Sequence, residues 1–173
     1  MIRALVAGGM LLAALVTAAG RNAAPVGKAM EGMVQVSGTD ASAYGAREVH
    51  AVRITLLEVL RGDSAWERIR EADKSAQPPE SGFEYLVAHI RLEYDPSGPE
   101  GTLAYSVKPD DFRAYSEDNR EYSRPALKPP KPELIGQTLS SGELHEGWLC
   151  FKVAETDPKP LLFFYGGMWF QLN

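Results

Sequence analysis

Hydrophobic and polar residues alternate most clearly between Phe83 and Tyr94. One face of this stretch would carry the apolar set Leu86, Ala88, Ile90, Leu92 and Tyr94. The other face would carry mostly polar or amphipathic side chains, namely Tyr85, His89, Arg91 and Glu93. A period of two residues is typical of a strand with one face in a core and the other toward solvent. The stretch therefore predicts a half-buried antiparallel strand, central in its sheet.

Short β-rich stretches recur along the rest of the chain and are separated by turn residues. They cover residues 49–60, 102–107, 111–115, 121–123, 144–153, 161–165 and 168–172. The cluster Glu117, Asp118 and Asn119 predicts a turn, and Gly166 with Gly167 predicts a two-residue hairpin turn. This spacing of strands and turns predicts an all-β fold, an immunoglobulin-like antiparallel β-sandwich of about seven or eight strands.

One segment has helical spacing instead. Apolar residues recur there at intervals of three or four positions, namely Ala65, Trp66, Ile69 and Ala72. Ser64 and Glu67 have the spacing of a capping box. We expect a bridging helix of about three turns from Ser64 to Ala72 that folds as a lid over one open end of the sandwich, with Trp66 as its anchor into the core. The prolines and glycine of residues 78–82 would end this connection before the next strand.

The first twenty residues have the layout of a signal peptide. Arg3 supplies a positive charge, an uncharged apolar run follows from Ala4 to Ala19, and small residues precede Arg21. We expect cleavage after Ala19 or Gly20, and the alternative is a retained membrane anchor. A lipid-anchored form requires a cysteine at the cleavage site, and this sequence has none there. The chain is therefore predicted to be secreted or associated with the cell envelope.

This layout divides the chain into three parts. Residues 1–20 are the signal peptide, residues 21–46 a flexible linker with one candidate strand at 33–37, and residues 47–173 the β-sandwich domain. Within the domain, the proline-rich residues 125–132 cannot form a central strand, because proline donates no backbone hydrogen bond. We interpret them as an extended loop, with a ligand for proline-recognition modules as the alternative.

Charge narrows the range of partners. The chain has 18 Lys and Arg residues against 23 Asp and Glu residues, a formal net charge of −5. A nucleic-acid-binding protein normally shows a concentrated basic patch, and binding to anionic lipid needs a polybasic segment. The sequence has neither, so we expect no nucleic-acid partner and membrane contact only through an uncleaved leader.

Residues that carry chemistry are few and scattered. His50, His89 and His145 lack zinc-ligand spacing, and no Gly-x-Ser-x-Gly elbow is present, although a triad built from distant residues stays open. Acidic pairs such as Asp110 and Asp111 fit solvated turns better than a calcium site. Cys150 is interpreted as a small buried hydrophobe rather than a reactive thiol. We predict no catalytic, cofactor-binding or metal-binding residues.

A family resemblance rests on residues spread over this domain. They are Arg61, Gly62, Ala65, Ile69, Pro79, Gly82, the run from Glu84 to Val87, Gly142, Gly147 and Phe151. This pattern resembles the bacterial extracellular immunoglobulin-like domain of unknown function (the DUF4352 type), which is similar in fold to secreted immunoprotective antigens. The resemblance covers approximately residues 49–173. It implies an exported protein, and it implies no known molecular function.

The carboxy-terminal hairpin is the best candidate for recognition. The sequence LLFFYGGMWF is so rich in aromatic and sulfur-bearing side chains that alternation buries only about half of them, unless both faces are covered. We predict a non-enzymatic module that binds a surface or extracellular protein. The alternative is a carbohydrate- or small-ligand-binding module, and a hydrolase ranks third. An exposed row of Trp and Tyr rings would favour glycan, a flat apolar edge would favour a protein, and an open edge strand could capture an extended peptide.

Overall fold

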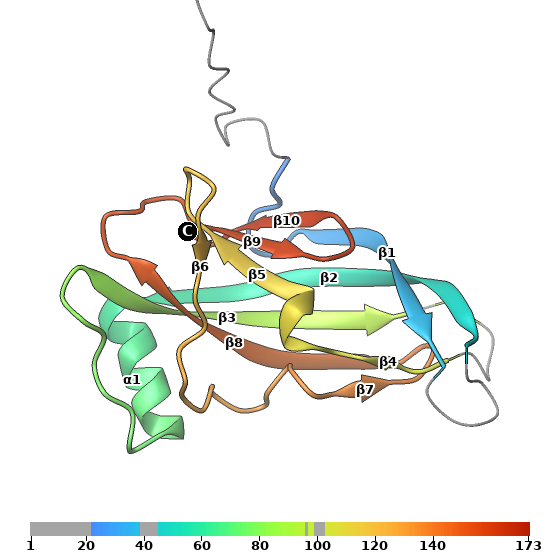
Figure 1. The fold of residues 1–173 in the computed structure, drawn as a ribbon, viewed down its shortest axis with the longest axis horizontal. Coiled ribbons are helices and arrows are strands. Elements are labelled where there is room, and N and C mark those ends of the chain that lie inside the picture. The colour runs from blue at the N-terminus through green and yellow to red at the C-terminus, as the bar shows by residue number, and fades with distance from the viewer. Residues whose placement is uncertain (1–21, 39–44, 96, 99–102) are drawn as a thin grey trace, which may run out of the picture.

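The computed structural model describes residues 22–38, 45–95, 97–98 and 103–173. The predicted signal peptide lies outside these residues. The described chain folds into two four-stranded sheets, a two-stranded sheet and one α-helix (Figure 1). Within the described part, no helix is long and apolar enough to cross a membrane.

The long sheet has the order β1-β2-β3-β8, and all its ladders are antiparallel. Its strands are β1 (Ala29–Ser37), β2 (Arg47–Arg61), β3 (Phe83–Tyr94) and β8 (Leu144–Ala154). The central strand β3 has the bounds that its alternation predicts, and its apolar face is fully buried. A register shift between Leu56 and Glu58 marks a bulge in β2, and the alternation of the buried residues Val52, Ile54 and Leu56 ends at this point.

The short sheet has the order β10-β9-β5-β6 and packs against the inner face of the long sheet. Its strands are β5 (Phe112–Tyr115), β6 (Glu121–Tyr122), β9 (Leu161–Phe164) and β10 (Met168–Gln171). A third ladder joins β4 (Tyr105–Ser106) to β7 (Thr138–Leu139). One hydrophobic core lies between the sheets and includes Leu92, Phe112, Phe151, Phe164 and Phe170. The fold is therefore the predicted immunoglobulin-like antiparallel β-sandwich.

The helix α1 (Gly62–Ala72) bridges β2 and β3, as predicted, but begins two residues early. Its N-cap is Arg61 without a side-chain capping hydrogen bond, so the predicted capping box of Ser64 and Glu67 does not form. Gly62 opens the helix at a φ of +57°, a conformation that favours glycine. The Arg61 guanidinium pairs with Glu84 of β3 and fixes the chain at this point.

The position of α1 also differs from the prediction. Its buried residues Ala65 and Ile69 form a second apolar cluster on the outer face of the long sheet, separate from the core of the sandwich. Trp66 is half-buried and lies against Tyr85, with 5.9 Å between ring centroids. The helix therefore covers the outside of β3 and β8 rather than an open end, because the odd-numbered residues of β3 here present a second apolar face.

The linker prediction needs a correction as well. The candidate strand at 33–37 exists but starts at Ala29, and β1 pairs with β2 over nine residues. Val34 and Val36 of β1 enter the core, and Ala24 forms an isolated bridge with Phe170 of β10. The chain from Asn22 to Ser37 is thus part of the sandwich, while residues 39–44 lie outside the described residues.

Smaller differences concern turns and very short strands. Met168 pairs with Phe164, so three residues, not two, connect β9 to β10, and Gly167 has a φ of +86°. Strand β7 was not predicted, and β4 is shorter than residues 102–107, where residue 102 lies outside the described residues. Each of these two-residue strands exists because its backbone pairs with the other, and a pairing between distant segments cannot be predicted from the local sequence.

Candidate binding surface

Three aromatic side chains lie together on the outer face of the short sheet. They are Tyr115 of β5, Phe163 of β9 and Trp169 of β10, and we call them the aromatic face. Trp169 stands opposite Phe163 in the β9–β10 ladder, and Tyr115 stands opposite Leu161 in the β5–β9 ladder. Their neighbours along the strands are buried in the core, so strand alternation directs these three rings outward.

The rings of the aromatic face contact one another closely. The centroid distance is 4.7 Å between Phe163 and Trp169, 5.6 Å between Tyr115 and Trp169, and 6.5 Å between Tyr115 and Phe163. The interplanar angles are 42°, 54° and 73° in the same order, so no two rings are parallel. Two aromatic rings in a tilted or edge-to-face arrangement stabilise each other. All three rings here are half-buried. The result is a compact apolar patch.

Charged residues line one side of the aromatic face. Arg113 stands opposite Phe163 in the β5–β9 ladder, and its guanidinium lies 3.4 Å from the Glu121 carboxylate. The Tyr115 hydroxyl lies 3.5 Å from the same carboxylate. The charge of Glu121 is the main reason that the pKa of Arg113 is raised. Arg113 and Glu121 also line a cavity of about 210 Å³, which is below the usual size of a small-molecule site.

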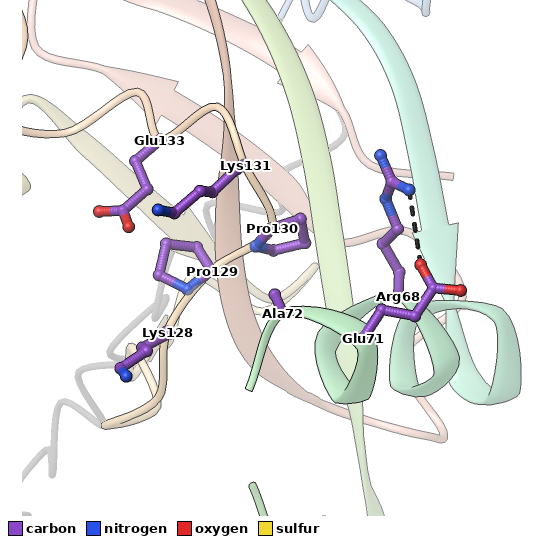
Figure 2. A pocket seen from close by; sticks show the side chains of 8 residues that line it. All are labelled: Arg68, Glu71, Ala72, Lys128, Pro129, Pro130, Lys131 and Glu133. Atoms are coloured by element: carbon purple, nitrogen blue, oxygen red, sulfur yellow. Dashed lines mark ion pairs between the residues drawn. The ribbon is translucent and has the colours of Figure 1, made fainter. Parts of the chain in front are cut away.

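A larger cavity of about 360 Å³ lies between the end of α1 and residues 128–133 (Figure 2). Its lining is Arg68, Glu71, Ala72, Lys128, Pro129, Pro130, Lys131 and Glu133. The proline-rich segment is an extended loop, as predicted, and Figure 2 shows its prolines facing the end of the helix. Cations and carboxylates are mixed here, and Arg68 pairs with Glu71 at 3.7 Å. A lining of mixed charge gives no preference for an anionic over a cationic ligand.

Asp73 fixes this loop to the helix end. Its carboxylate accepts hydrogen bonds from the Ser75 hydroxyl at 2.6 Å, the Ser75 amide at 3.0 Å and the Lys128 amide at 3.2 Å. These bonds, chiefly that of the Ser75 hydroxyl, lower the pKa of Asp73. The cavity is therefore a by-product of a structural contact that joins residues 55 positions apart.

His50 contacts two carboxylates, an arrangement that could in principle belong to a metal or catalytic site. Its Nε2 lies 2.8 Å from Glu48 and its Nδ1 lies 3.1 Å from Asp95. Since the two carboxylates sit on opposite sides of the ring, they and the imidazole cannot converge on one ion. The Ser141 hydroxyl donates to Asp95, at 3.2 Å, rather than to His50, so Ser141 and His50 do not form a pair of nucleophile and base. Neither cavity described above is lined by these residues.

The carboxylate of Glu48 also holds the start of the following segment. It accepts the Leu103 amide at 3.0 Å, and this bond, ahead of the one with His50, lowers the pKa of Glu48. The cluster thus joins β2 to the residues that lead into β4. Its geometry supports a structural role.

The other histidines are separated from each other. His89 stacks on Trp148 with 4.5 Å between centroids, and the Nε2 of His145 lies 3.0 Å from the carbonyl oxygen of Glu133. Within the described ranges, no three His, Cys, Asp or Glu side chains gather in a way that could hold a metal ion. Cys150 is buried, and burial raises the pKa of its thiol to about 12, which confirms the interpretation as a small hydrophobe.

The acidic turns also have structural partners. Asp111 is buried and accepts the Tyr105 hydroxyl and the Lys108 amide, both at 2.7 Å, whereas the neighbouring Asp110 is exposed. The two carboxylates therefore do not converge as calcium ligands. The cluster at residues 117–119 is an exposed turn, as predicted, and Asp118 pairs with Arg120 at 2.9 Å.

Sequence reasoning identified only part of the aromatic face. It singled out the hairpin that supplies Phe163 and Trp169 but not Tyr115, Arg113 or Glu121. The alternation of buried Phe112 and Ala114 with half-buried Arg113 and Tyr115 was the available signal. Only the pairing of β5 with β9 places them beside the hairpin.

One comparison with a solved structure supports the fold. No protein-family model matches the chain, and no curated protein matches it either, so the expected DUF4352-type membership stays a prediction. A candidate lipoprotein (ycdA) from Bacillus subtilis is similar in structure, with 16% sequence identity and a TM-score of 0.51. The alignment covers 70% of this chain but only 36% of that chain. The secreted protein MPT63 from Mycobacterium tuberculosis aligns at 12% identity and a TM-score of 0.44 over 80% of this chain and 92% of that one. At 16% identity the likeness to the Bacillus subtilis lipoprotein concerns the fold alone, and no argument rests on the alignment with MPT63.

Proposed function

We propose that this chain is an exported, non-enzymatic interaction domain that binds a protein at the cell surface or outside the cell. The aromatic face carries the proposal. Trp, Tyr and Arg are the residues most enriched among those that dominate binding energy, and Trp169, Tyr115 and Arg113 lie together here. The signal-peptide layout of residues 1–20 supports export.

The tilt of the rings favours a protein over a glycan. A glycan platform presents ring faces to flat sugar surfaces, whereas these rings lie at 42° to 73° to one another. A compact apolar patch with a charged rim has the make-up of a protein interface. Carbohydrate binding through Trp169 and Tyr115 is the second candidate, because both rings keep part of their surface exposed.

The binding-module proposal also fits the polar clusters. A hydrolase needs a nucleophile in contact with a base, and the hydroxyl of Ser141 donates to a carboxylate instead. Both ring nitrogens of His50 contact carboxylates, Nδ1 that of Asp95 and Nε2 that of Glu48. We therefore assign these groups to stability rather than catalysis.

The test compares wild type with Trp169→Ala and Tyr115→Ala. Cross-linking to surface extracts of the native host, followed by mass spectrometry, would identify captured proteins and map the cross-links. We expect cross-links around β5, β9 and β10 and, for a purified partner, roughly a 30-fold weaker affinity after Trp169→Ala. Phe83→Ala is the matched control, since Phe83 is an exposed aromatic outside this sheet.

Two outcomes would count against the proposal. Capture that is equal for wild type and Trp169→Ala would remove the aromatic face from the interface. Binding to a glycan array that Trp169→Ala abolishes, without a captured protein, would favour the carbohydrate alternative. Thermal unfolding of each variant separates lost binding from lost folding.

A further inference from the structure

Arg124 lies at the beginning of the segment that covers the edge of β8. At this end of the segment, the Lys152 amide of β8 donates to the Ser123 carbonyl at 3.2 Å. At the other end, the Trp148 amide donates to the Pro132 carbonyl at 2.9 Å. The backbone next to Arg124 is therefore fixed against the long sheet.

Backbone oxygens and an aromatic ring hold the Arg124 guanidinium in place. Its Nη2 donates to the Phe112 carbonyl at 2.6 Å and to the Pro109 carbonyl at 3.1 Å. Its Cζ lies 4.9 Å from the ring centroid of Phe151, a side chain that is buried in the core. A guanidinium has N–H donors on three nitrogens, and these bonds use Nη2 alone. Within the described part of the chain, Nε and Nη1 have no hydrogen-bond partner.

This guanidinium also lacks a counter-charge among the described residues. Each of the other half-buried arginines there pairs with a carboxylate, namely Arg53, Arg61, Arg68, Arg91 and Arg113. Arg47 and Arg70 form no ion pair with a described residue either, but both are exposed to water. Burial lowers the pKa of Arg124, because a charged group that has lost water is destabilised. A charge in this position is stabilised by a nearby anion.

The guanidinium lines the cavity of about 210 Å³ beside the aromatic face. Arg113 lines the same cavity and stands opposite Phe163 of the aromatic face in the β5–β9 ladder. The volume is below that of a usual small-molecule site, but a single carboxylate group needs much less space. An anion in this cavity would supply the charge that Arg124 lacks.

We propose that this cavity binds a carboxylate group through the free N–H donors of Arg124, and that the group belongs to an acidic side chain of the protein bound at the aromatic face. The source of the carboxylate rests on the proposed function, whereas the anion site itself does not. Hydrogen bonds between a guanidinium and a carboxylate are charge-assisted and therefore stronger than neutral ones.

The charges around the cavity favour a carboxylate over a phosphate. Asp110 and Glu121 also line it, and their carboxylates lie 3.7 Å and 3.4 Å from the guanidinium of Arg113. Both are engaged with Arg113, and the side chain of Asp110 is 91% exposed, so neither neutralises Arg124. They repel a doubly charged phosphate more strongly than a singly charged carboxylate.

An acetate titration of the wild-type chain tests the anion site without any partner or variant. The readout is the Nε–H signal of Arg124 in nitrogen-15 NMR spectra, with sodium chloride keeping the ionic strength constant. We expect a saturable shift with a dissociation constant of roughly 5 to 100 mM, the range for one charge-assisted hydrogen bond, and a smaller effect of phosphate. Arg120 is the internal control, since its side chain is 84% exposed and pairs with Asp118, and its signal should not saturate.

A second measurement tests the source of the carboxylate. For a protein captured through the aromatic face, Arg124→Lys should weaken binding roughly tenfold or more, because the ammonium does not reproduce the N–H donors of Nε and Nη1. Arg70→Lys is the matched control, since Arg70 is exposed and forms no ion pair with a described residue, and it should bind like wild type. Thermal unfolding of both variants checks that they are folded.

The two measurements fail separately. An Arg124 signal that shifts no more than that of Arg120 would overturn the anion site and leave the proposed function as it stands. Saturable acetate binding, with equal partner affinity for wild type and Arg124→Lys, would overturn the acidic side chain as the source and assign the site to a free carboxylate. Absence of any captured partner would count against the proposed function, while the acetate titration still decides the anion site.

Discussion

Gly147 on β8 is a position where one added methyl group should meet backbone atoms and destabilise the fold. Residues 133 and 134 cross the strand so closely that a Cβ at Gly147 would lie 2.5 Å from the Leu134 nitrogen and 2.7 Å from its Cα. Nonbonded carbon atoms pack at about 3.5 to 4.0 Å, so Gly147→Ala requires a shift of roughly 1 Å. The obstructing atoms are backbone, and Leu134 is fully buried in the core. A side-chain rotation therefore cannot relieve the clash.

The expected cost follows from this geometry. Overpacking of a filled core costs about 1 to 3 kcal/mol, and a backbone obstacle places Gly147→Ala in the upper part of that range. For a chain of this size, such a loss lowers the melting temperature by roughly 4 to 12 °C. The covering of the β8 edge should loosen as well, because the shift pushes residues 133 and 134 away from the strand.

Two measurements test this reasoning. Urea unfolding gives the loss of stability, and hydrogen exchange of the Trp148 amide, which donates to Pro132 at 2.9 Å, reports the covering segment. The control is Gly32→Ala, where the added methyl group first meets the flexible end of the Met168 side chain, at 2.9 Å. It should cost less. Unchanged stability of Gly147→Ala, with unchanged exchange at Trp148, would refute the argument.

Three further predictions concern the helix and the buried thiol. The pKa of Asp73 is lowered chiefly by the Ser75 hydroxyl, so its carboxylate stabilises the fold above the unfolded pKa and loses this contribution as pH falls through the folded pKa. Thermal unfolding should show Asp73→Asn less stable than wild type at neutral pH, with the gap closing in acid; a gap independent of pH would contradict this. Ile69→Ala should cost about 2 to 5 kcal/mol in urea unfolding, against little change for the exposed Arg70→Ala, and equal effects would contradict the packing of α1. Since burial raises the pKa of Cys150 to about 12, a thiol reagent at pH 8 should label only the unfolded chain, and rapid labelling of the folded chain would show an accessible thiol.

The strands that are predictable from the sequence are those with a core on one side. Alternation predicts β3 at its observed bounds and the strands of the carboxy-terminal hairpin within a residue. In these segments burial alone decides which side chain points inward, so local pattern and final structure agree. The helix is predictable for the same reason, because Ala65 and Ile69 recur on one side.

The elements that escape prediction depend on distant partners. Val34 and Val36 are the only clear pattern in β1, and its full length comes from pairing with β2. The capping box fails because Arg61 pairs with Glu84 of β3 and sets the helix start at Gly62. Local spacing describes what a segment prefers, and the tertiary contact decides where it ends.

The candidate surface shows the same limit. Alternation indicates that Trp169 and Tyr115 point out of the core, but they meet only because β9 lies between β5 and β10. The partner of His50, Asp95, is likewise 45 residues away in the sequence. Strand order is a property of the whole chain and cannot be derived from any one segment.

The contrast between the two outer faces of the sandwich explains why the aromatic face stands out. On the long sheet, α1 covers one half, and ion pairs cross the strands of the other half, from Arg53 to Glu31 at 2.8 Å and to Glu93 at 3.2 Å. Charged side chains of this kind keep a sheet face hydrated and discourage nonspecific contact. On the short sheet, by contrast, no helix of the described residues covers Trp169 and the two further rings, and the ion pair between Arg113 and Glu121 lies at one side of them. Packing does not require large apolar rings on a solvent face, and this is the argument for the proposed binding role of the aromatic face.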